Sequence, residues 1–336
     1  MTLGQPQHGG EPPFSVGTER PDWLDLSTGI APFAYPFSFP GASAWQKLPR
    51  LREEQAALTA AGQYFGLGRQ SDICLGPGSQ ALLQLLPELL PTGAVGVLSP
   101  TYGEHAYRWA QAGHQVHEVA GFAELPPECR YVVLVNPNNP TGALHEPRDL
   151  LSLAALLAAR EGYLIVDEAF CDVLPDSSLA AYAGEPGLLI LRSFGKFFGL
   201  AGLRLGFLLG PVEILAKARL RIGPWSVNGP ALAIAAQAYN DDAWIAAHRQ
   251  RLAGQAAKLQ FLLAGHGEIL GGTDLFVLLS SDRAGDILAR LAAAHIHVRD
   301  FADQKTWLRF GLPGDDAAWS RLQDVLTSKH DILSRP

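Results

Sequence analysis

Apolar residues follow two alternating patterns along the first two thirds of the chain. Short runs of apolar, often β-branched residues alternate with longer stretches in which apolar positions recur with the helical period. This alternation is typical of a parallel sheet covered by helices. Strands are predicted over residues 72–75, 95–99, 115–119, 131–135, 163–166, 188–192 and 205–209. Helices are predicted over residues 79–90, 103–112 and 147–160.

The pattern changes from Pro230 onward. Long Ala- and Leu-rich helices are followed by a predicted strand at residues 275–279, a helix from Ala284 and two short strands near Val298 and Leu308. The expected fold is therefore α/β, with a mostly parallel seven-stranded sheet sandwiched by helices and a smaller α/β C-terminal domain. The expected division is an N-terminal arm and small-domain segment (1–45), a large domain (46–235) and a small domain (236–336).

Composition and charge narrow the possible partners. With 33 acidic and 26 basic residues the formal charge is −7, which argues against a basic nucleic-acid binder. The most apolar stretch, residues 81–98, is interrupted by Gln84, Pro87, Glu88 and Pro91, so it falls short of a membrane span. We expect neither a nucleic acid nor a membrane as a partner.

The remaining compositional signals favour a cytoplasmic protein. Residues 1–13 lack the basic patch and apolar core of a secretory signal. The cysteines Cys74, Cys129 and Cys171 are odd in number and isolated, which predicts neither a disulfide framework nor a metal clip. Three reduced thiols, no metal and a cytoplasmic location are the expectation.

Three sequence blocks carry the chemistry, and each begins where a predicted strand ends. They are NPNNPTG (136–142), DEAF (167–170) and SFGKFFGLAGLRLG (193–206). In the last block, Lys196 is followed by glycines three, six and ten residues later, where the backbone must turn tightly and approach something closely. Open α/β sheets bind their ligands at the carboxyl ends of the strands. The blocks therefore predict one ligand site.

In this order, the three blocks resemble the fold-type I pyridoxal-phosphate enzymes of the class I/II aminotransferase group, over roughly residues 25–312. The resemblance implies that residues 46–235 bind pyridoxal 5'-phosphate. It also implies that Lys196 holds the cofactor covalently through its amine, that Asp167 pairs with the pyridinium nitrogen, and that Asn139 hydrogen-bonds the ring 3-oxygen.

These residue types suit that cofactor. The ring is the better electron sink when its nitrogen keeps a proton, which a buried carboxylate such as Asp167 would hold there. A lysine must be neutral to attack, and nearby positive charge together with desolvation encourages that state. Arg204 supplies such charge, and it could grip the cofactor phosphate bidentately alongside Ser193.

A further phosphate-binding segment is predicted at residues 76–80, GPGSQ, which end a strand and open a helix. The N–H groups of Gly78, Ser79 and Gln80 would form an anion cup. Because Ala81 occupies the place of a third glycine, the fingerprint of a dinucleotide site is not completed. Tyr102 matches the position where relatives stack an aromatic ring on the cofactor. Its alternative role is ordinary core packing.

Two arginines are candidates for binding the substrate. Arg309, in WLRFG, matches the arginine that takes the substrate α-carboxylate in this group, and its alternative is a surface ion pair. Arg299, in HVRD, is a candidate second anion clamp, and its alternative is pairing with Asp300 or Asp303.

Two departures from the family pattern weaken the case for ordinary transamination. Phe170 stands where many aminotransferases have a tyrosine that contacts the ring oxygen, so Asn139 would act there alone. Leu48 stands where relatives often place a tyrosine that reaches the cofactor phosphate of a neighbouring subunit.

The start of the chain points to another reaction. HGG at 8–10, followed by LDLSTGIAP at 24–32, is similar to the opening of the threonine-phosphate decarboxylases of cobalamin biosynthesis. The resemblance implies that His8, Gly29 and Ile30 bind substrate, with His8 on its phosphate. A histidine in an inert tail is the alternative. The expected reaction is decarboxylation of L-threonine O-3-phosphate to (R)-1-amino-2-propanol O-2-phosphate.

Two other functions stay open at this point. One is an aminotransferase of the histidinol-phosphate type that uses 2-oxoglutarate, and the other is a catalytically silent regulatory protein that binds the cofactor. In the leading interpretation the partners are a phosphorylated amino acid and, as is usual for this fold, a second copy of the chain in a homodimer.

Overall fold

The computed structural model describes residues 6, 8–10, 23–69 and 72–328 of the chain. These residues fall into two compact units. Unit 1 is built on residues 34–250, and unit 2 combines the described residues of 8–33 with residues 251–328. The division into domains 1–45, 46–235 and 236–336 remains a prediction.

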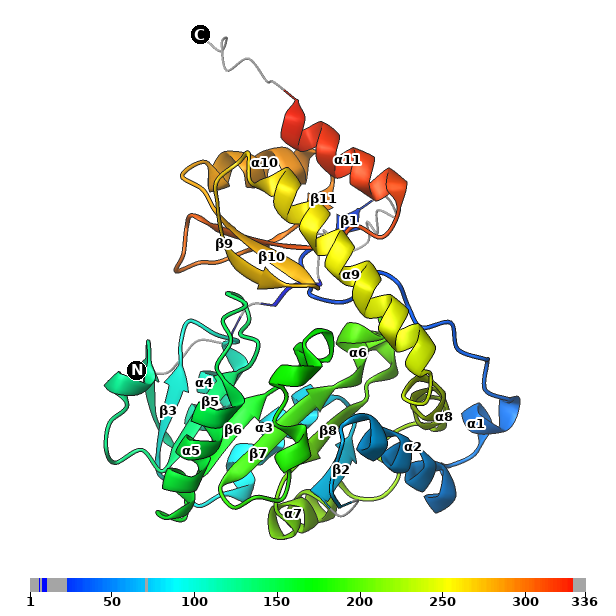
Figure 1. Cartoon of the computed structure of the whole chain (residues 1–336), viewed down its shortest axis with the longest axis vertical. Helices are drawn as coiled ribbons and strands as arrows, with labels where there is room; N and C mark the ends of the chain where they lie inside the picture. The colour runs from blue at the N-terminus through cyan, green and yellow to red at the C-terminus, as the bar shows by residue number, and fades with distance from the viewer. Residues whose placement is uncertain (1–5, 7, 11–22, 70–71, 329–336) are drawn as a thin grey trace. The chain divides into compact units, whose positions relative to one another are not determined.

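Unit 1 contains a seven-stranded sheet with the order β2-β8-β7-β6-β5-β3-β4 (Figure 1). Its strands are β2 (Ile73–Gly76), β3 (Ala94–Leu98), β4 (Gln115–Val119), β5 (Tyr131–Val135), β6 (Tyr163–Asp167), β7 (Leu188–Ser193) and β8 (Gly206–Leu209). Only β8 runs antiparallel to its neighbours, β2 and β7. The fold class expected from the sequence is confirmed, because all seven predicted strands occur and form one mostly parallel sheet.

Helices cover both faces of this sheet. Those that lie wholly in unit 1 are α1 (Ala42–Gln46), α2 (Leu51–Tyr64), α3 (Ser79–Leu89), α4 (Glu104–Gln111), α5 (Pro147–Ala158), α6 (Phe194–Phe197), α7 (Val212–Ile222) and α8 (Gly229–Ala238). The helix α9 (Asp242–Leu263) begins in unit 1. Short 3-10 turns are η2 (Phe122–Glu124), η3 (Cys171–Val173), η4 (Pro175–Ser177), η5 (Ala180–Tyr182) and η6 (Ala201–Leu203).

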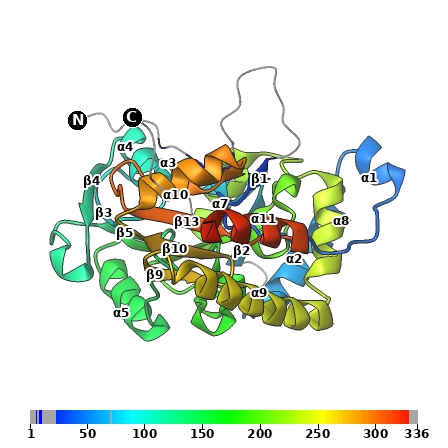
Figure 2. The ribbon, with the colours of Figure 1, turned by 90° about the horizontal axis from the view of Figure 1, so that it is seen from above.

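The two faces of the sheet use alternate residues of each strand. In β7, Leu189 and Leu191 join the core cluster that α3, α4 and α7 complete. The helix α5 packs on β6 and β7 from the opposite face, as both ribbon views show (Figures 1 and 2). Both faces are therefore buried, and this is why β5 is apolar throughout rather than alternating.

Helix boundaries follow local chemistry. Pro147 occupies the first turn of α5, where its missing N–H would have had no intrahelical partner. Before α8, the Asn228 side chain accepts a hydrogen bond from the Ala231 N–H at 2.9 Å. Such caps fix where a helix begins, and the predicted start of α5 coincides with the observed one.

Unit 2 is a smaller α/β body. Its four-stranded antiparallel sheet has the order β12-β13-β10-β9, and a second, two-stranded sheet pairs β1 with β11. The elements are β1 (Leu24–Asp25), β9 (Glu268–Thr273), β10 (Phe276–Ser280), α10 (Ala284–Ala293), β11 (Ile296–His297), β12 (Arg299–Asp300), β13 (Trp307–Gly311) and α11 (Asp316–Thr327).

Some helices and strands of the structure are not predicted by the sequence pattern. The strand β9 contains Gly271 and Gly272, and it gains its stability by pairing with β10. Glycine weakens the strand signal because it has no side chain to pack. The helices α2, α7 and α11 were not predicted either.

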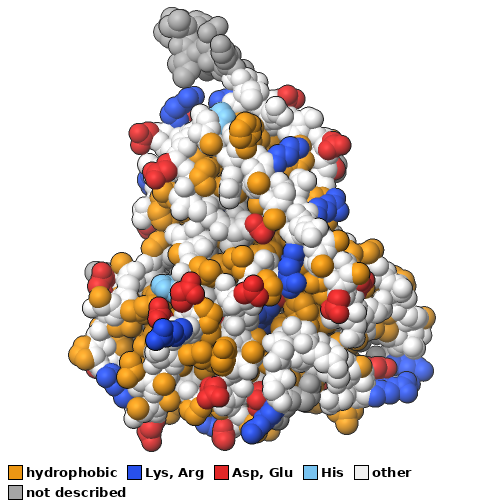
Figure 3. All heavy atoms as spheres, in the orientation of Figure 1, with side chains coloured by type: hydrophobic (Ala, Val, Ile, Leu, Met, Phe, Trp, Pro, Cys, Tyr) orange, Lys and Arg blue, Asp and Glu red, His pale blue; other side chains and the backbone are white. Residues whose placement is uncertain are grey.

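Charged side chains of both signs are interspersed with hydrophobic ones on the face drawn in Figure 3. Among the described residues, none of the helices has the length and apolar character that a membrane crossing requires.

Candidate active site

The three chemical blocks meet at one edge of the sheet, because β5, β6 and β7 are parallel neighbours. Asp167 is the last residue of β6, and Ser193 is the last residue of β7. Lys196 follows in α6. The backbone N–H of Asn136 donates to the carbonyl of Asp167 at 2.9 Å, which joins the ends of β5 and β6. The structure thus brings the block that contains Asn139 next to the Asp167 strand.

Asp167 is a buried carboxylate with two defined partners. Only 5% of the residue is exposed. Its Oδ2 lies 3.0 Å from Nε2 of the buried His105, and its Oδ1 accepts a hydrogen bond from the Ala169 N–H at 3.0 Å. A carboxylate removed from water needs such partners to keep its charge. The geometry therefore supplies a fixed anion able to hold a cationic ring nitrogen.

Lys196 is half-buried, and its surroundings include an aromatic face. Its Nζ lies 5.5 Å from the centroid of the Phe170 ring. Phe170 belongs to the same block as Asp167, so the lysine amine and the carboxylate segment share one region of unit 1. The side chain at position 170 places no hydroxyl beside the amine.

Gly78 belongs to the segment predicted as a phosphate cup. This glycine precedes α3 with φ +88°, and a Cβ placed on it would lie 2.7 Å from Nη2 of Arg204. Gly206 approaches its neighbour even more closely, since a Cβ placed on it would lie 2.2 Å from the Ser79 nitrogen. Both glycines are therefore required by close approach. The guanidinium of Arg204 and the first N–H groups of α3 lie at one point, which suits a phosphate.

Tyr102 and Gln80 form a hydrogen-bonded chain beside this cup. The Tyr102 hydroxyl donates to Gln80 Oε1 at 3.0 Å, and Gln80 Nε2 donates to Glu104 Oε2 at 2.6 Å. Glu104 is buried and pairs with Arg108 at 2.8 Å. Burial raises the pKa of Tyr102, and the charges of Glu104 and Asp167 raise it further. Tyr102 is therefore held as a neutral phenol.

Asn139 lies in the loop after β5 and is half-buried. The neighbouring asparagine braces this loop. Asn138 donates to the Pro100 carbonyl at 3.0 Å and accepts from the Thr101 hydroxyl at 2.7 Å. These contacts tie the loop after β5 to the loop after β3.

A second group of candidates lies in unit 2. Arg309 is 7% exposed, and its Nη2 donates to the Ser27 carbonyl at 2.6 Å. Arg299 is directly opposite Arg309 in the β12–β13 register, so both side chains stand on the same face of that sheet. Burial lowers the pKa of Arg299, while Asp300 acts in the opposite direction. Two cations directly opposite each other repel, and an anion bound between them would relieve the repulsion.

The histidine-diglycine segment is attached to the same place in unit 2. The Gly10 N–H donates to Ser27 Oγ at 2.7 Å, and a Cβ on Gly9 would lie 2.6 Å from the Ser27 carbonyl oxygen. Ser27 thus contacts both the diglycine and Arg309. The adjoining His8 is exposed, Gly29 is buried and Ile30 is half-buried. Gly9 is explained by its close approach to Ser27, and Gly10 by its φ of +92°.

Sequence analysis missed His105, although it is the histidine that contacts Asp167. It lies three residues after Tyr102, at the start of α4, and is 1% exposed. A polar residue among the apolar positions of a helix was the only available signal. Its partner is 62 residues away, which no local pattern could identify.

Residues 41–325 match the family described as Aminotransferase class I and II, and the chain belongs to that family. Two similar proteins are named threonine-phosphate decarboxylase. The protein of Pseudomonas aeruginosa is 47% identical over 91% of this chain and 91% of its own. The protein of Sinorhizobium sp is 43% identical over 95% of this chain and 97% of its own. The resemblances inferred from the blocks and from the N-terminal segment are confirmed.

Solved structures agree on the fold. The histidinol-phosphate aminotransferase from Clostridium acetobutylicum matches with a TM-score of 0.76 at 20% identity, covering 90% of this chain and 98% of that chain. The L-threonine-O-3-phosphate decarboxylase from Porphyromonas gingivalis matches with a TM-score of 0.75 at 15% identity and the same coverage. At these identities the likeness concerns the fold alone.

The pairing of His105 with Asp167 predicts a specific loss of stability. We expect His105→Phe to lower the free energy of unfolding by about 2 kcal/mol, because it removes a hydrogen bond to a buried charge. Urea titration of the protein measures this loss. His114→Phe is the matched control, since His114 is also buried but its hydrogen bond is with the neutral Pro87 carbonyl, at 3.0 Å. It should lose about 1 kcal/mol. Equal losses would contradict the special role of Asp167.

Proposed function

We propose that this chain is a pyridoxal-phosphate-dependent decarboxylase. It converts L-threonine O-3-phosphate into carbon dioxide and (R)-1-amino-2-propanol O-2-phosphate, in cobalamin biosynthesis. The observation that carries the proposal is the 47% and 43% identity to two threonine-phosphate decarboxylases over more than nine tenths of the chain. The phosphorylated amino acid named by those relatives is the substrate of this chain.

The residues of unit 1 fit pyridoxal phosphate. The close contact between Gly78 and the Arg204 guanidinium makes a cradle that a β-carbon would fill, as expected of a phosphate site. Ser79, Gln80 and Ser193 complete that site. Asp167 would be the buried anion for the ring nitrogen, Asn139 would hydrogen-bond the ring oxygen and Tyr102 would stack on the ring. Lys196 would form the covalent link.

When bound, pyridoxal phosphate serves as an electron sink for the pair left at Cα as carbon dioxide departs. Asp167 makes that sink effective by holding a proton at the ring nitrogen, and His105 keeps the carboxylate in place for this purpose. The Lys196 amine then delivers a proton to Cα, which completes the exchange of a carboxylate for a hydrogen. The Phe170 ring face lies beside the amine and stabilises the protonated form that delivers this proton.

The substrate carries two anionic groups, and unit 2 supplies cationic groups to match. Arg299 and Arg309 stand on one face of the sheet, and the segment that carries His8 is bound to the Ser27 that also holds Arg309. Guanidinium groups bind carboxylate and phosphate bidentately, so two of them can fix the substrate at both ends. Holding both ends would restrict how the substrate is oriented, and therefore which bond at Cα can break.

We place this enzyme in the cytoplasm as a homodimer. The cysteines Cys74, Cys129 and Cys171 are all buried free thiols, as expected in a reducing compartment. Large apolar side chains are exposed around α1 and the start of α2. They are Phe39 at 75%, Trp45 at 57%, Leu48 at 63% and Leu51 at 79%. The Phe39 and Trp45 rings stack on each other, and exposed apolar side chains of this kind are suited to contact with a second copy of the chain.

The reaction class is tested by supplying the proposed substrate. Purified protein reconstituted with pyridoxal phosphate should release carbon dioxide from threonine phosphate at the same rate with and without 2-oxoglutarate. Lys196→Ala should abolish the release. A requirement for 2-oxoglutarate, with formation of glutamate, would instead identify an aminotransferase of the histidinol-phosphate type. Cofactor binding without either reaction would identify a silent regulatory protein.

The arginine pair predicts a defect in substrate binding. We expect Arg299→Met to raise KM for threonine phosphate tenfold or more, because one charge-assisted contact is lost. Affinity for pyridoxal phosphate, measured by fluorescence titration, should stay unchanged. Arg283→Met removes an exposed cation from the same unit and serves as the control. An unchanged KM in Arg299→Met would remove Arg299 from the substrate site.

The exposed apolar side chains predict an effect on assembly. Sedimentation velocity should give the mass of two chains for the unaltered protein at micromolar concentration. Trp45→Glu combined with Leu51→Glu should shift it toward one chain, since a charge buried in an apolar interface is costly. Glu substitution at the exposed Phe261 of α9 is the control and should leave the mass unchanged. A single-chain mass for the unaltered protein would refute the homodimer.

A further inference from the structure

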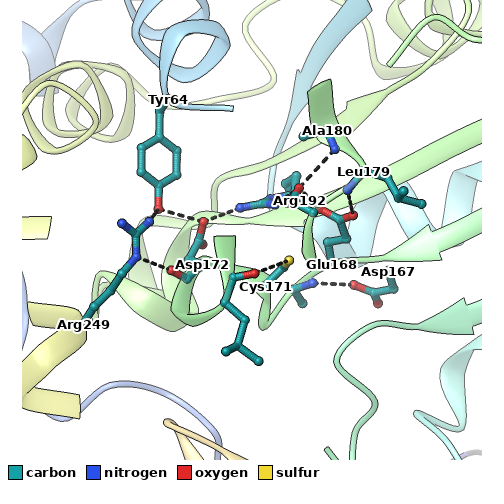
Figure 4. Close-up of polar contacts among 12 residues, drawn as sticks. Tyr64, Asp167, Glu168, Cys171, Asp172, Leu179, Ala180, Arg192 and Arg249 are labelled. Carbon is teal, nitrogen blue, oxygen red and sulfur yellow. Dashed lines mark hydrogen bonds and ion pairs between the residues drawn. The ribbon is translucent and has the colours of Figure 1, made fainter. Parts of the chain in front are cut away.

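A buried network of charged residues lies next to the proposed cofactor residues, and the reaction does not use it. Its centre is Arg192, which is 4% exposed. Arg192 donates from Nη1 to Glu168 Oε2 at 2.7 Å and from Nη2 to Asp172 Oδ1 (Figure 4). Glu168 is fully buried and also accepts from the Leu179 N–H at 2.6 Å and from the Ser178 hydroxyl at 2.5 Å.

The network continues into two helices. The Tyr64 hydroxyl, at the end of α2, donates to Asp172 Oδ1 at 3.0 Å. Arg249, on α9, donates from Nε to the Asp172 carbonyl at 2.7 Å and from Nη2 to the Tyr64 hydroxyl at 3.0 Å. Figure 4 shows Tyr64, Asp172 and Arg249 converging on one point, with Arg192 between Asp172 and Glu168.

The network matters for the site because two of its residues are adjacent in the sequence to proposed cofactor residues. Glu168 directly follows Asp167, and Arg192 directly precedes Ser193. The ion pair between Glu168 and Arg192 therefore ties together the two strand ends that bear the proposed cofactor contacts. Next to Arg249, His248 contacts the Phe197 carbonyl from its Nε2 at 2.9 Å, and Phe197 directly follows Lys196.

The charges within the network balance. Arg192 and Arg249 carry two positive charges, and Glu168 and Asp172 carry two negative ones. Burial acts to lower the pKa of Arg192, but Asp172 and Glu168 outweigh it, so this pKa lies well above the ordinary value. Burial raises the pKa of Tyr64, which keeps its phenol protonated as a donor. Buried ion pairs often give little more stability than apolar side chains of the same volume. Geometric specificity is a better reason for this arrangement.

We propose that Tyr64, Asp172 and Arg249 are positioning residues that fix Asp167 and Lys196 relative to each other by holding the Glu168–Arg192 pair in place. The proposal rests on the cofactor role given above to Asp167 and Lys196. Displacements of about 1 Å in a preorganised site can cost a hundredfold in rate. Loss of the outer contacts should therefore weaken cofactor binding more than it weakens folding.

The test compares two tyrosines that lose the same group. Tyr64→Phe keeps the ring that packs on Phe65 and Tyr239 and removes only the hydroxyl. Tyr131→Phe is the control, because its buried hydroxyl donates to the Pro91 carbonyl at 2.7 Å, beside the starts of β3 and β5 rather than their carboxyl ends. Affinity for pyridoxal phosphate is measured by fluorescence titration of the apoprotein, and stability by urea titration of the same samples.

We expect both variants to lose stability, and Tyr64→Phe to lose somewhat more, because its hydroxyl contacts the charged Asp172 and Arg249 whereas that of Tyr131 contacts a neutral carbonyl. Tyr64→Phe should bind pyridoxal phosphate at least fivefold more weakly and should shift the pH midpoint of the visible absorption band of the bound cofactor, whereas Tyr131→Phe should do neither. Arg249→Lys keeps the charge but cannot reach both the Asp172 carbonyl and the Tyr64 hydroxyl, so it should repeat the Tyr64→Phe result.

Unchanged affinity and an unchanged band in Tyr64→Phe would overturn the proposal and leave the network a purely structural feature. Should Arg249→Lys fail to fold, Tyr64→Phe decides alone. No substrate enters this experiment. A protein that releases no carbon dioxide from threonine phosphate but shows the expected affinity changes would therefore refute the substrate and keep the positioning role.

Discussion

A carboxylate that is almost shielded from water stays charged only when the protein provides the hydrogen bonds that water would otherwise give. At Asp167 these come from the His105 ring and from the Ala169 N–H. The rest of unit 1 is organised around this requirement. The strand β6 brings the carboxylate to the edge of the sheet, β7 brings Lys196 to the same edge, and α4 contributes both His105 and the buried Glu104 that holds Gln80.

At the same edge of the sheet, several backbone segments lie very close to one another. Gly78 and Gly206 allow β8, the start of α3 and the Arg204 side chain to lie within contact distance of one another. A side chain at either glycine would separate these elements. The positive groups at the start of α3 could then no longer act together on one anion. The close backbone packing at these two glycines therefore also determines where the positive groups of the site lie.

In unit 2, the candidate binding residues are positioned by the pairing of two strands. Its two candidate arginines come from neighbouring strands and are placed opposite each other by the antiparallel register. Ser27 connects one of them to residues 8–10, because its carbonyl accepts from Arg309 while its hydroxyl accepts from the Gly10 N–H. The close approach to Ser27 is possible because Gly9 has no side chain.

The sequence by itself determined the layered α/β fold. Runs of buried residues such as Tyr131–Val135 reveal strands covered on both faces. It also gave Lys196, Asp167 and Asn139 as candidates, because these blocks follow directly after strands and parallel strands end at one edge. The runs of apolar residues and the blocks that follow the strands are both local features, so a pattern within a short stretch of sequence is enough to reveal them.

Only the tertiary structure decided which distant residues meet. His105 reaches Asp167 across 62 positions and Tyr64 reaches Asp172 across 108, and nothing in either segment specifies its partner. The pairing of Arg299 with Arg309 depends on the register of two strands, which a shift of one residue would reverse. Such contacts arise from how the elements pack, because packing joins side chains whose separation along the chain leaves no pattern to read.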